Sequence, residues 1–256
     1  MSSTILKVQD LSINFGGVKA VDGVNLDVKQ GSITSVIGPN GAGKTTLFNM
    51  ISGIYKPTSG SLLFDGKEIA GKKQHEISKA GIARTFQNIR LYEGLTVLGN
   101  VQAVLDARTD YNIAQALLRL PGTRSKDKAN VARCEEYLDL VDMLDYKDEK
   151  PGSLPYGLQR KLEIARALAA SPKILLLDEP GAGLNSVEVD DLILLIDKIK
   201  KKYDLTVLLI EHRLQVVYTL SSYVYVLNFG KLLAEGLPHD IQNNAEVIAA
   251  YMGGDD

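Results

Sequence analysis

One short stretch constrains the fold of this chain more than any other part of its sequence. Residues 38–45 read Gly-Pro-Asn-Gly-Ala-Gly-Lys-Thr, which fits the pattern G-x-x-x-x-G-K-[ST]. Apolar residues ending at Ile37 predict a buried strand before this stretch, and residues 45–52 predict a helix after it. A strand, a glycine-rich loop and a helix in this order are typical of an α/β fold whose loop surrounds phosphate groups.

The residue types of this loop suit phosphate binding. Glycines let backbone N–H groups turn toward phosphate oxygens, and the following helix directs its positive N-terminus at the same charge. We expect Lys44 to reach the β- and γ-phosphates of ATP and Thr45 to ligate Mg²⁺. A chance glycine-rich turn is the alternative, and the flanking strand and helix argue against it. The candidate ATP-binding residues here are Gly38, Pro39, Asn40, Gly41, Ala42, Gly43, Lys44, Thr45 and Thr46.

A second candidate site lies at the end of an apolar run. Residues 174–177 read Ile-Leu-Leu-Leu, and Asp178 and Glu179 follow directly. A buried strand presents its last side chains at the carboxyl edge of a sheet, where ligands bind in such folds. We expect Asp178 to hold Mg²⁺ directly or through water, and Glu179 to polarise the attacking water. The alternative interpretation is a strand followed by a solvated acidic turn. The presence of the phosphate loop in the same chain argues against it.

The rest of the pattern predicts an α/β protein with a mainly parallel sheet, an antiparallel β subdomain and an inserted helical subdomain. Alternating apolar residues predict the antiparallel part, with strands at 5–8, 11–15 and 24–28 and a hairpin at 61–69 that turns at Asp65-Gly66. Helical spacing predicts the inserted part at 97–107, 113–120 and 126–141. Thereafter we expect helices at 156–170 and 186–202, strands at 173–178 and 205–210, a hairpin at 223–236 and a short helix near 246–251.

Composition limits the class of protein. The 256 residues carry a net charge of -2, which gives no electrostatic basis for nucleic-acid binding. Cys134 is the only cysteine, so no internal disulfide forms. The N-terminus lacks the pattern of a signal peptide. The apolar runs are far shorter than the roughly 20 residues of a membrane span. If this protein works at a membrane, other chains must cross it.

Further motifs identify the chain by resemblance as a member of the ABC ATPase family. Gln87 follows Arg-Thr-Phe, residues 154–168 read LPYGLQRKLEIARAL, and His212 follows an expected strand. Phosphate loop, glutamine, signature helix, acidic strand and histidine occur in the family's order across nearly the whole chain. Within the family the sequence resembles the ATP-binding subunits of branched-chain amino acid importers. This closer match is carried by Tyr156-Gly157 and by the stretches ARTFQNIRLYEGLTVLGNV and DIQNNAEVIAAYMG.

The resemblance implies a sandwich of two ATPase subunits, with each ATP between one chain's phosphate loop and the other chain's signature. Phe15 matches the aromatic residue that stacks on adenine, with Ala20 nearby. Gln87 matches a residue that contacts Mg²⁺ and water and senses the permease, and His212 matches one that contacts the γ-phosphate. Taken singly, Phe15 fits a core residue equally well, whereas Gln87 fits a surface amide better and His212 fits a helix-capping histidine better. The order and context of the motifs favour the functional roles instead. The signature residues are Leu154, Pro155, Tyr156, Gly157, Leu158 and Gln159, and the implied catalytic residues are Lys44, Glu179 and His212.

The resemblance also implies one ABC ATPase domain over residues 1–256. Its β lobe and core would span 1–94 and 160–236, its helical lobe about 95–159, and a C-terminal helix 237–256. The implied partners are a second ATPase subunit, identical or different, transmembrane permease subunits and, indirectly, a solute-binding protein. Nucleic acid is not among them. The implied location is cytoplasmic, at the inner face of the cell membrane.

Three positions depart from the family pattern. Pro155 replaces the usual serine and Leu158 the glutamine of the signature, and Asn185 stands where aspartate is more usual. Proline suits a first helical turn but removes a hydroxyl donor to the γ-phosphate, a loss of about 1.5–3 kcal/mol. Asn185 and Glu188 predict a capping box that starts the helix at 186–202.

Two alternative functions stay open. One is an ABC ATPase outside transport, such as a translation or DNA-repair factor, although such relatives usually join two ATPase units or insert a long coiled coil. The other is the ATPase of an exporter, such as one that extracts a lipid. The single set of motifs favours transport over the first alternative, and the motifs do not distinguish import from export.

Overall fold

The computed structural model describes residues 3–108 and 121–252, so the helix predicted at 113–120 lies outside the described residues. The chain forms two compact units. The first unit comprises residues 1–87 and 173–256, and the second comprises residues 88–172. Within the described ranges, no helix combines the length and the apolar composition that a membrane crossing requires.

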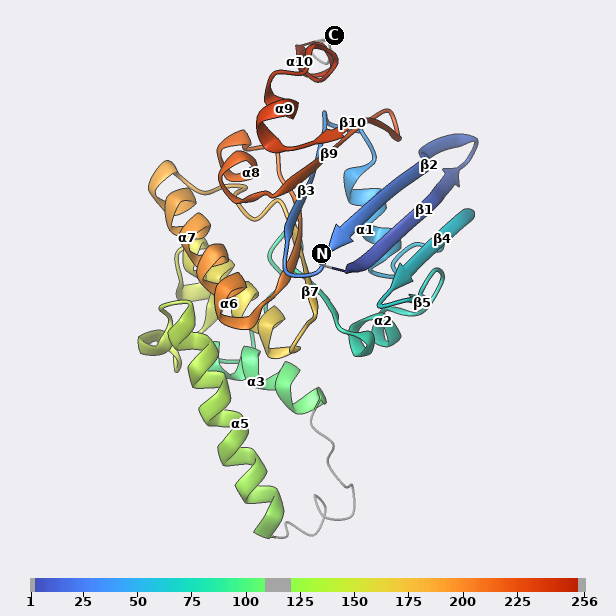
Figure 1. Cartoon of the computed structure of the whole chain (residues 1–256). Coiled ribbons are helices and arrows are strands. Elements are labelled where there is room, and N and C mark those ends of the chain that lie inside the picture. The colour runs from blue at the N-terminus through green and yellow to red at the C-terminus, as the bar shows by residue number, and fades with distance from the viewer. Residues whose placement is uncertain (1–2, 109–120, 253–256) are drawn as a thin grey trace. The chain divides into compact units, whose positions relative to one another are not determined.

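A six-stranded sheet forms the centre of the first unit (Figure 1). Its strands β9, β3, β8, β7 and β6 are all parallel, and β10 pairs antiparallel with β9 at one end. Every residue of β3, β7 and β8 is buried, which explains why β7 and β8 are mainly apolar. The α/β fold with a mainly parallel sheet is thereby confirmed. The strands are β3 (Ile33–Ile37), β6 (Ile82–Arg84), β7 (Ile174–Asp178), β8 (Thr206–Ile210), β9 (Tyr223–Asn228) and β10 (Lys231–Gly236).

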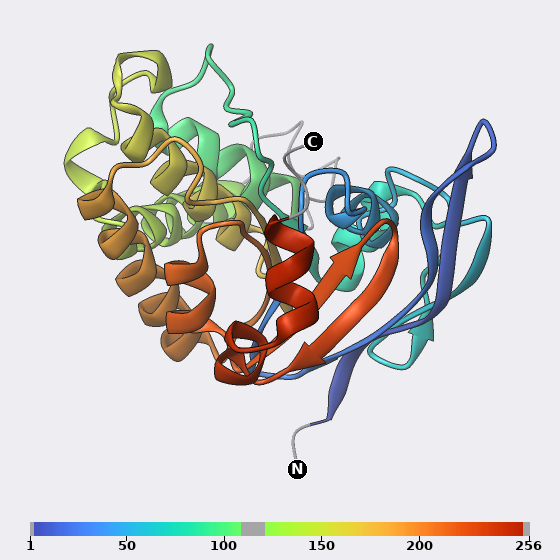
Figure 2. The same cartoon turned by 90° about the horizontal axis from the view of Figure 1, so that it is seen from above.

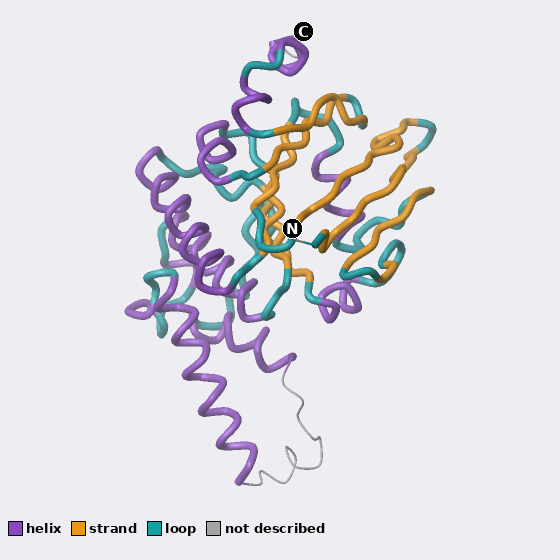
Figure 3. The backbone as a smooth tube through the Cα atoms, viewed as in Figure 1, coloured by secondary structure: helices purple, strands orange, loops and turns teal. Residues whose placement is uncertain are grey.

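A second, antiparallel sheet has the order β2-β1-β4-β5 (Figure 3, strands in orange). The separate strands expected at 5–8 and 11–15 are wrong, because they form one strand that pairs with β2 as a long hairpin (Figure 2). Asp10 has a φ of +46° and the register shifts between Val8 and Leu11, so the strand bends without ending. The strands are β1 (Thr4–Phe15), β2 (Val18–Lys29), β4 (Ser59–Phe64) and β5 (Lys67–Glu68).

The turn between β4 and β5 confirms the predicted hairpin. Asp65 and Gly66 have φ values of +50° and +72°, and a type I′ turn requires positive φ at both positions. A continuous apolar cluster then joins the two sheets and the helix after the phosphate loop, and Leu6, Phe48 and Leu208 are among its fully buried members. This cluster fixes the phosphate loop between the two sheets.

Six helices of the first unit surround these sheets. They are α1 (Lys44–Ile51), α2 (Gln74–Ala80), α7 (Ser186–Tyr203), α8 (Leu214–Leu220), α9 (Pro238–Gln242) and α10 (Ala245–Met252). The capping box predicted for α7 is confirmed. Asn185 Oδ1 accepts from the backbone N–H of Glu188 at 3.0 Å, and the Glu188 carboxylate accepts from the N–H of Asn185 at 2.9 Å.

The single C-terminal helix expected at 237–256 is wrong, because residues 243 and 244 interrupt it. Helix α9 ends at Gln242 with Asn243 as its C-cap, and the side chain of Asn244 accepts from the backbone N–H groups of Glu246 and Val247 at 2.9 and 3.1 Å. Asparagine caps a new helix in this way, so a second helix starts instead of the first one continuing.

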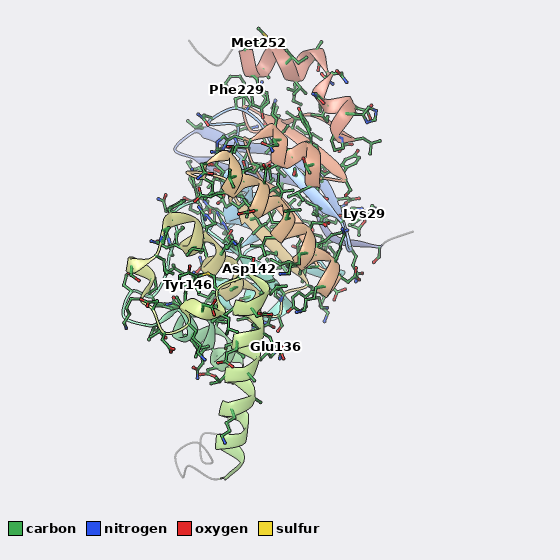
Figure 4. All side chains as sticks on the ribbon, turned by 90° about the vertical axis from the view of Figure 1, so that its left-hand side faces the viewer. Lys29, Glu136, Asp142, Tyr146, Phe229 and Met252 are labelled. Carbon is green, nitrogen blue, oxygen red and sulfur yellow. The ribbon has the colours of Figure 1, made fainter. Side chains whose placement is uncertain are left out.

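The second unit is helical. It contains α3 (Val97–Arg108), α5 (Pro121–Leu140), α6 (Tyr156–Ala169) and the 3₁₀ turns η1 (Leu144–Tyr146) and η2 (Pro151–Ser153). Helix α5 buries Cys134, Tyr137 and Leu138, whereas Glu136 on α5 and Tyr146 on η1 are exposed (Figure 4). Helix α6 packs against α3 and α5, so all of it belongs to this unit, which extends beyond the helical lobe expected at 95–159.

Candidate nucleotide-binding site

The loop between β3 and α1 has the backbone that its sequence requires. Gly38 has a φ of +148°, and a Cβ atom there would lie 2.1 Å from the carbonyl oxygen of Leu227. Gly43 has a φ of +100°, and its Cβ atom would lie 2.6 Å from the carbonyl oxygen of Ala20. Both positions therefore need glycine for space as well as for conformation. The same contact places the backbone of Ala20 beside the loop.

Lys44 lies folded over its own loop. Its Nζ donates to the carbonyl oxygens of Gly38 at 2.7 Å and Pro39 at 2.8 Å, and the residue is only 6% exposed. Burial lowers the pKa of Lys44, and the carboxylates of Glu179 and Asp178 partly oppose this effect. The ammonium group is therefore already close to the two acidic residues at the end of β7.

Asp178 ends β7 and is 2% exposed. Its Oδ2 accepts from Arg84 Nη2 at 2.7 Å, while its Oδ1 has no hydrogen-bond partner among the described residues. A buried carboxylate oxygen without a donor is costly unless a cation or water satisfies it. Asp178 Oδ1 therefore has the chemistry of a metal-ligand position. Thr45, the second expected Mg²⁺ ligand, is exposed in the first turn of α1.

Glu179 lies next to two side chains from the segments that follow neighbouring parallel strands. Its Oε2 accepts from Gln87 Nε2 at 2.8 Å, and His212 Nδ1 lies 3.7 Å from the same oxygen. Glu179 also has a φ of +48°, an unusual value for a residue other than glycine. Residues held in this conformation cluster at functional sites, where the surrounding contacts impose it. The structure thus brings Gln87, Glu179 and His212 together at the carboxyl edge of the sheet, where the phosphate loop also lies.

The sequence analysis did not predict a role in the site for two charged residues at this edge of the sheet. Arg84, which pairs with Asp178, is the first. Glu211 is the second: it is fully buried and accepts from the backbone N–H groups of Gly181 at 2.6 Å, His212 at 3.0 Å and Arg213 at 3.0 Å. Glu211 therefore fixes the backbone on both sides of the site. The sequence feature that could have indicated Glu211 is its position as a charged residue directly after the apolar strand β8.

Phe15, the expected adenine-stacking residue, lies at the end of β1 and is 43% exposed. Its ring meets the ring of Tyr55 edge-on, with centroids 5.2 Å apart. Tyr55 was also missed by the sequence analysis, and its contact restricts the orientation of the Phe15 ring. An exposed aromatic face in a fixed orientation can stack on a planar base.

The signature residues lie in the second unit, at the start of α6. Pro155 occupies the N-cap position and makes no side-chain cap hydrogen bond. Its carbonyl oxygen accepts from the backbone N–H groups of Leu158 at 3.0 Å and Gln159 at 3.1 Å. Gln159 Nε2 donates to the carbonyl oxygen of Leu154 at 2.9 Å, and Tyr156 is exposed. Tyr156 and Gly157 therefore provide the first backbone N–H groups of α6, at the positive end of its dipole.

Two family models match the chain. The model of the ABC transporter family matches residues 21–182, and a model described as branched-chain amino acid ATP-binding cassette transporter matches residues 231–256. The chain is 43% identical over 253 residues to the high-affinity branched-chain amino acid transport ATP-binding protein BraF of Pseudomonas aeruginosa. It is 40% identical to LivG of Escherichia coli, which has the same description. Each alignment covers 99% of both proteins.

Solved structures agree with these alignments. The ADP conformation of MJ1267, an ATP-binding cassette of an ABC transporter, has a TM-score of 0.84 at 31% identity and covers 98% of this chain and 100% of that one. The dimeric structure of MJ0796, a bacterial ABC transporter cassette, has a TM-score of 0.77 at 27% identity and covers 91% and 98%. Both comparisons extend over nearly the full length of the chain.

Proposed function

Because this chain belongs to the ABC transporter family of ATP-binding proteins, we propose that it is the ATP-hydrolysing subunit of an importer for branched-chain amino acids. The observation that carries the ATPase assignment is the cluster of Gln87, Glu179 and His212 at the sheet edge that also holds Lys44 and Asp178. The likeness to BraF and LivG over their full lengths supports the choice of solute.

ATP is the substrate of this site, and its phosphates would lie in the loop at 38–45. Lys44 would exchange its two loop carbonyls for phosphate oxygens, which a cation prefers because they are charged. Backbone N–H groups of the loop and of the first turn of α1 would bind the same anion. The ring of Phe15, held by Tyr55, would stack on adenine beside Ala20.

Mg²⁺ fits the residues present. Asp178 Oδ1 and the Thr45 hydroxyl would hold it, with Gln87 as a further contact. In the described ranges no group of three or more His, Cys, Asp or Glu side chains is placed to hold a metal ion by itself. This suits Mg²⁺, which binds through one or two carboxylates together with substrate phosphates. When bound, it supplies neutralisation of the charge that develops on the phosphate oxygens.

Glu179 is the proposed general base for the attacking water. Gln87 holds its carboxylate by one hydrogen bond, and His212 stands close enough to help orient it. The His212 side chain is 51% exposed, so it remains able to reach a γ-phosphate. Glu211 fixes the backbone of His212 and of Gly181, which follows the base, and thereby holds both sides of the site.

A second ATPase subunit would complete each site with its signature. The first backbone N–H groups of α6, at Tyr156 and Gly157, suit the γ-phosphate of an ATP held by the partner. The dimeric MJ0796 structure supports such an assembly. We propose further that the partner is a different ATPase chain, because Pro155 lacks the hydroxyl of the usual signature and would weaken the site that it completes.

The permease subunits would dock on the segment 88–95 of the second unit, and this docking would hold the chain at the inner face of the membrane. Tyr92 and Leu95 in this segment are 51% and 39% exposed. Arg166 of the signature helix stacks on the Tyr92 ring at 5.3 Å, so a partner that moves Tyr92 would also move α6. Replacing Tyr92 and Leu95 with glutamate should prevent assembly with the permease while the isolated subunit still binds ATP. Unchanged assembly would place the docking surface elsewhere.

The function is tested by coexpressing the chain with the permease and ATPase genes that neighbour it and reconstituting the complex in proteoliposomes. Binding protein loaded with leucine, isoleucine or valine should stimulate ATP hydrolysis and solute uptake. Binding protein incubated with glycine and binding protein without any solute serve as matched controls. ATP hydrolysis that responds to a lipid and not to any binding protein would favour the exporter alternative. A chain that copurifies with no permease would favour a function outside transport.

A further inference from the structure

Arg84 joins three parts of the site that are far apart in the sequence. It ends β6, three residues before Gln87, and is almost completely buried. Its Nη1 donates to Asn49 Oδ1 and Ser52 Oγ, both at 2.8 Å, and its Nη2 donates to Asp178 Oδ2 at 2.7 Å. Asn49 lies in α1, whose first turn carries Lys44 and Thr45, and Ser52 caps the C-terminus of that helix.

The surroundings of Arg84 hold its guanidinium group in one position. The Phe48 and Phe86 rings lie 5.6 and 5.2 Å from its Cζ atom, within the range of cation–π contacts. A guanidinium group is planar and directs its N–H donors in fixed directions, unlike the freely rotating ammonium of lysine. The donors of Arg84 can therefore fix the direction of a carboxylate relative to a helix.

The two oxygens of Asp178 have different roles in this arrangement. Oδ2 is occupied by Arg84, whereas Oδ1 is buried without a partner among the described residues. An aspartate free to rotate about its terminal torsion would exchange these oxygens. The ion pair prevents the exchange, so that Oδ2 stays occupied and Oδ1 stays available to a cation.

We propose that Arg84 is a positioning residue for Mg²⁺: it locks Asp178 to α1 so that Asp178 Oδ1 and the Thr45 hydroxyl keep a fixed separation. This inference rests on the proposed function, because it assigns a role toward the metal of the same site. Arg84 touches neither nucleotide nor metal and acts through Asp178. Since Gln87 follows three residues later, the same lock fixes the start of the segment that carries Gln87.

The test uses two variants that separate the contact of Arg84 with Asp178 from its contacts with Asn49 and Ser52. Arg84→Lys keeps a positive charge next to Asp178 but cannot bridge to α1 with the same geometry. The double variant Asn49→Ala with Ser52→Ala keeps the ion pair with Asp178 and removes its attachment to α1. Arg133→Lys, an exposed arginine of the second unit, is the matched control for the exchange of arginine by lysine.

The readout is the affinity of the isolated subunit for a fluorescent ADP analogue, measured with Mg²⁺ and with EDTA. Wild type and Arg133→Lys should show the same gain in affinity on adding Mg²⁺. Arg84→Lys and the double variant should lose about tenfold of that gain, the effect of one hydrogen bond to a charged group, and should keep the affinity in EDTA. In the assembled transporter the KM for Mg-ATP should rise for the same reason.

A role of Arg84 in folding alone would give a different result. The melting temperature would fall, but the gain from Mg²⁺ would match that of wild type, and this outcome would overturn the proposal. If Arg84→Lys loses the gain and the double variant keeps it, the lock to α1 is overturned. If Arg84→Lys does not fold, the double variant alone decides. If wild type binds no nucleotide at all, the proposed function fails instead.

Discussion

The side-chain amide of Gln87 donates to the carboxylate of Glu179 at 2.8 Å. The two residues are 92 positions apart in the sequence, and they meet because β6 and β7 are neighbouring parallel strands whose carboxyl ends lie at one edge. A glutamine that senses the permease would therefore also orient the proposed general base. If the permease moves Gln87, as the resemblance implies, this contact would pass that motion to the proposed base.

Glu179→Gln should keep ATP binding and lose most hydrolysis. An amide cannot accept the proton of water as a carboxylate does, and general-base catalysis contributes about 10²–10⁴-fold. ATP turnover of the assembled transporter and ATP affinity of the subunit are measured side by side. Glu188→Gln is the matched control, because glutamine also suits the capping box of α7. A Glu179→Gln turnover within about threefold of wild type, far from the 10²-fold loss expected of a general base, would refute its assignment.

Lys44→Ala should weaken the binding of ATP and ADP by at least about tenfold, since it removes hydrogen bonds to charged phosphates. The loop carbonyls of Gly38 and Pro39 lose their donor as well, but both can turn to water. We therefore expect a folded variant. Titration with a fluorescent ATP analogue and a melting curve test the two statements separately, with Lys201→Ala on the surface of α7 as control. Unchanged affinity would speak against the assigned role.

Pro155→Ser should raise the ATPase activity of the assembled transporter by a small factor, because it restores a donor to the partner's nucleotide. In a transporter with two different ATPase chains, the other site would remain complete without this change. Serine also caps helices, so the isolated variant should gain about 0.5–2 kcal/mol of stability from the start of α6. Melting curves separate this gain from catalysis. Unchanged ATPase activity in a native complex with two copies of this chain would contradict the unequal sites.

Cys134 should react with thiol reagents only when the chain unfolds. Burial raises the pKa of its thiol to about 11, with a smaller contribution from the charge of Asp106. An exposed cysteine has a pKa of about 8.5, so at pH 8 the folded chain holds far less of the reactive thiolate. The raised pKa stabilises the fold below about pH 8.5, and this contribution is lost as the pH rises toward 11.

Labelling of Cys134 with Ellman's reagent across a urea titration at pH 8 tests this prediction. Modification should follow unfolding as measured by circular dichroism. A second titration at pH 10 should give a lower urea midpoint. Complete modification of native protein within seconds would show that Cys134 is accessible and that its environment in α5 is wrongly described.

Local sequence was sufficient wherever the deciding contacts are local. The phosphate loop is set by glycines and by the strand and helix on either side, and Asn185 and Glu188 form their capping box across three residues. The turn at Asp65-Gly66 follows from two adjacent residues. The order of the motifs indicated the family, which the alignments with BraF and LivG confirm.

Tertiary structure alone decided the contacts between distant residues. Arg84 and Asp178 are 94 positions apart, and no local pattern indicates that they pair. The burial of Lys44 and Glu211 depends on the packing of several strands, and the membership of all of α6 in the second unit depends on its contacts with α3 and α5. Sequence periodicity reports which face of an element is apolar, whereas the partner of a buried charge is fixed only when the sheet brings the ends of its strands together.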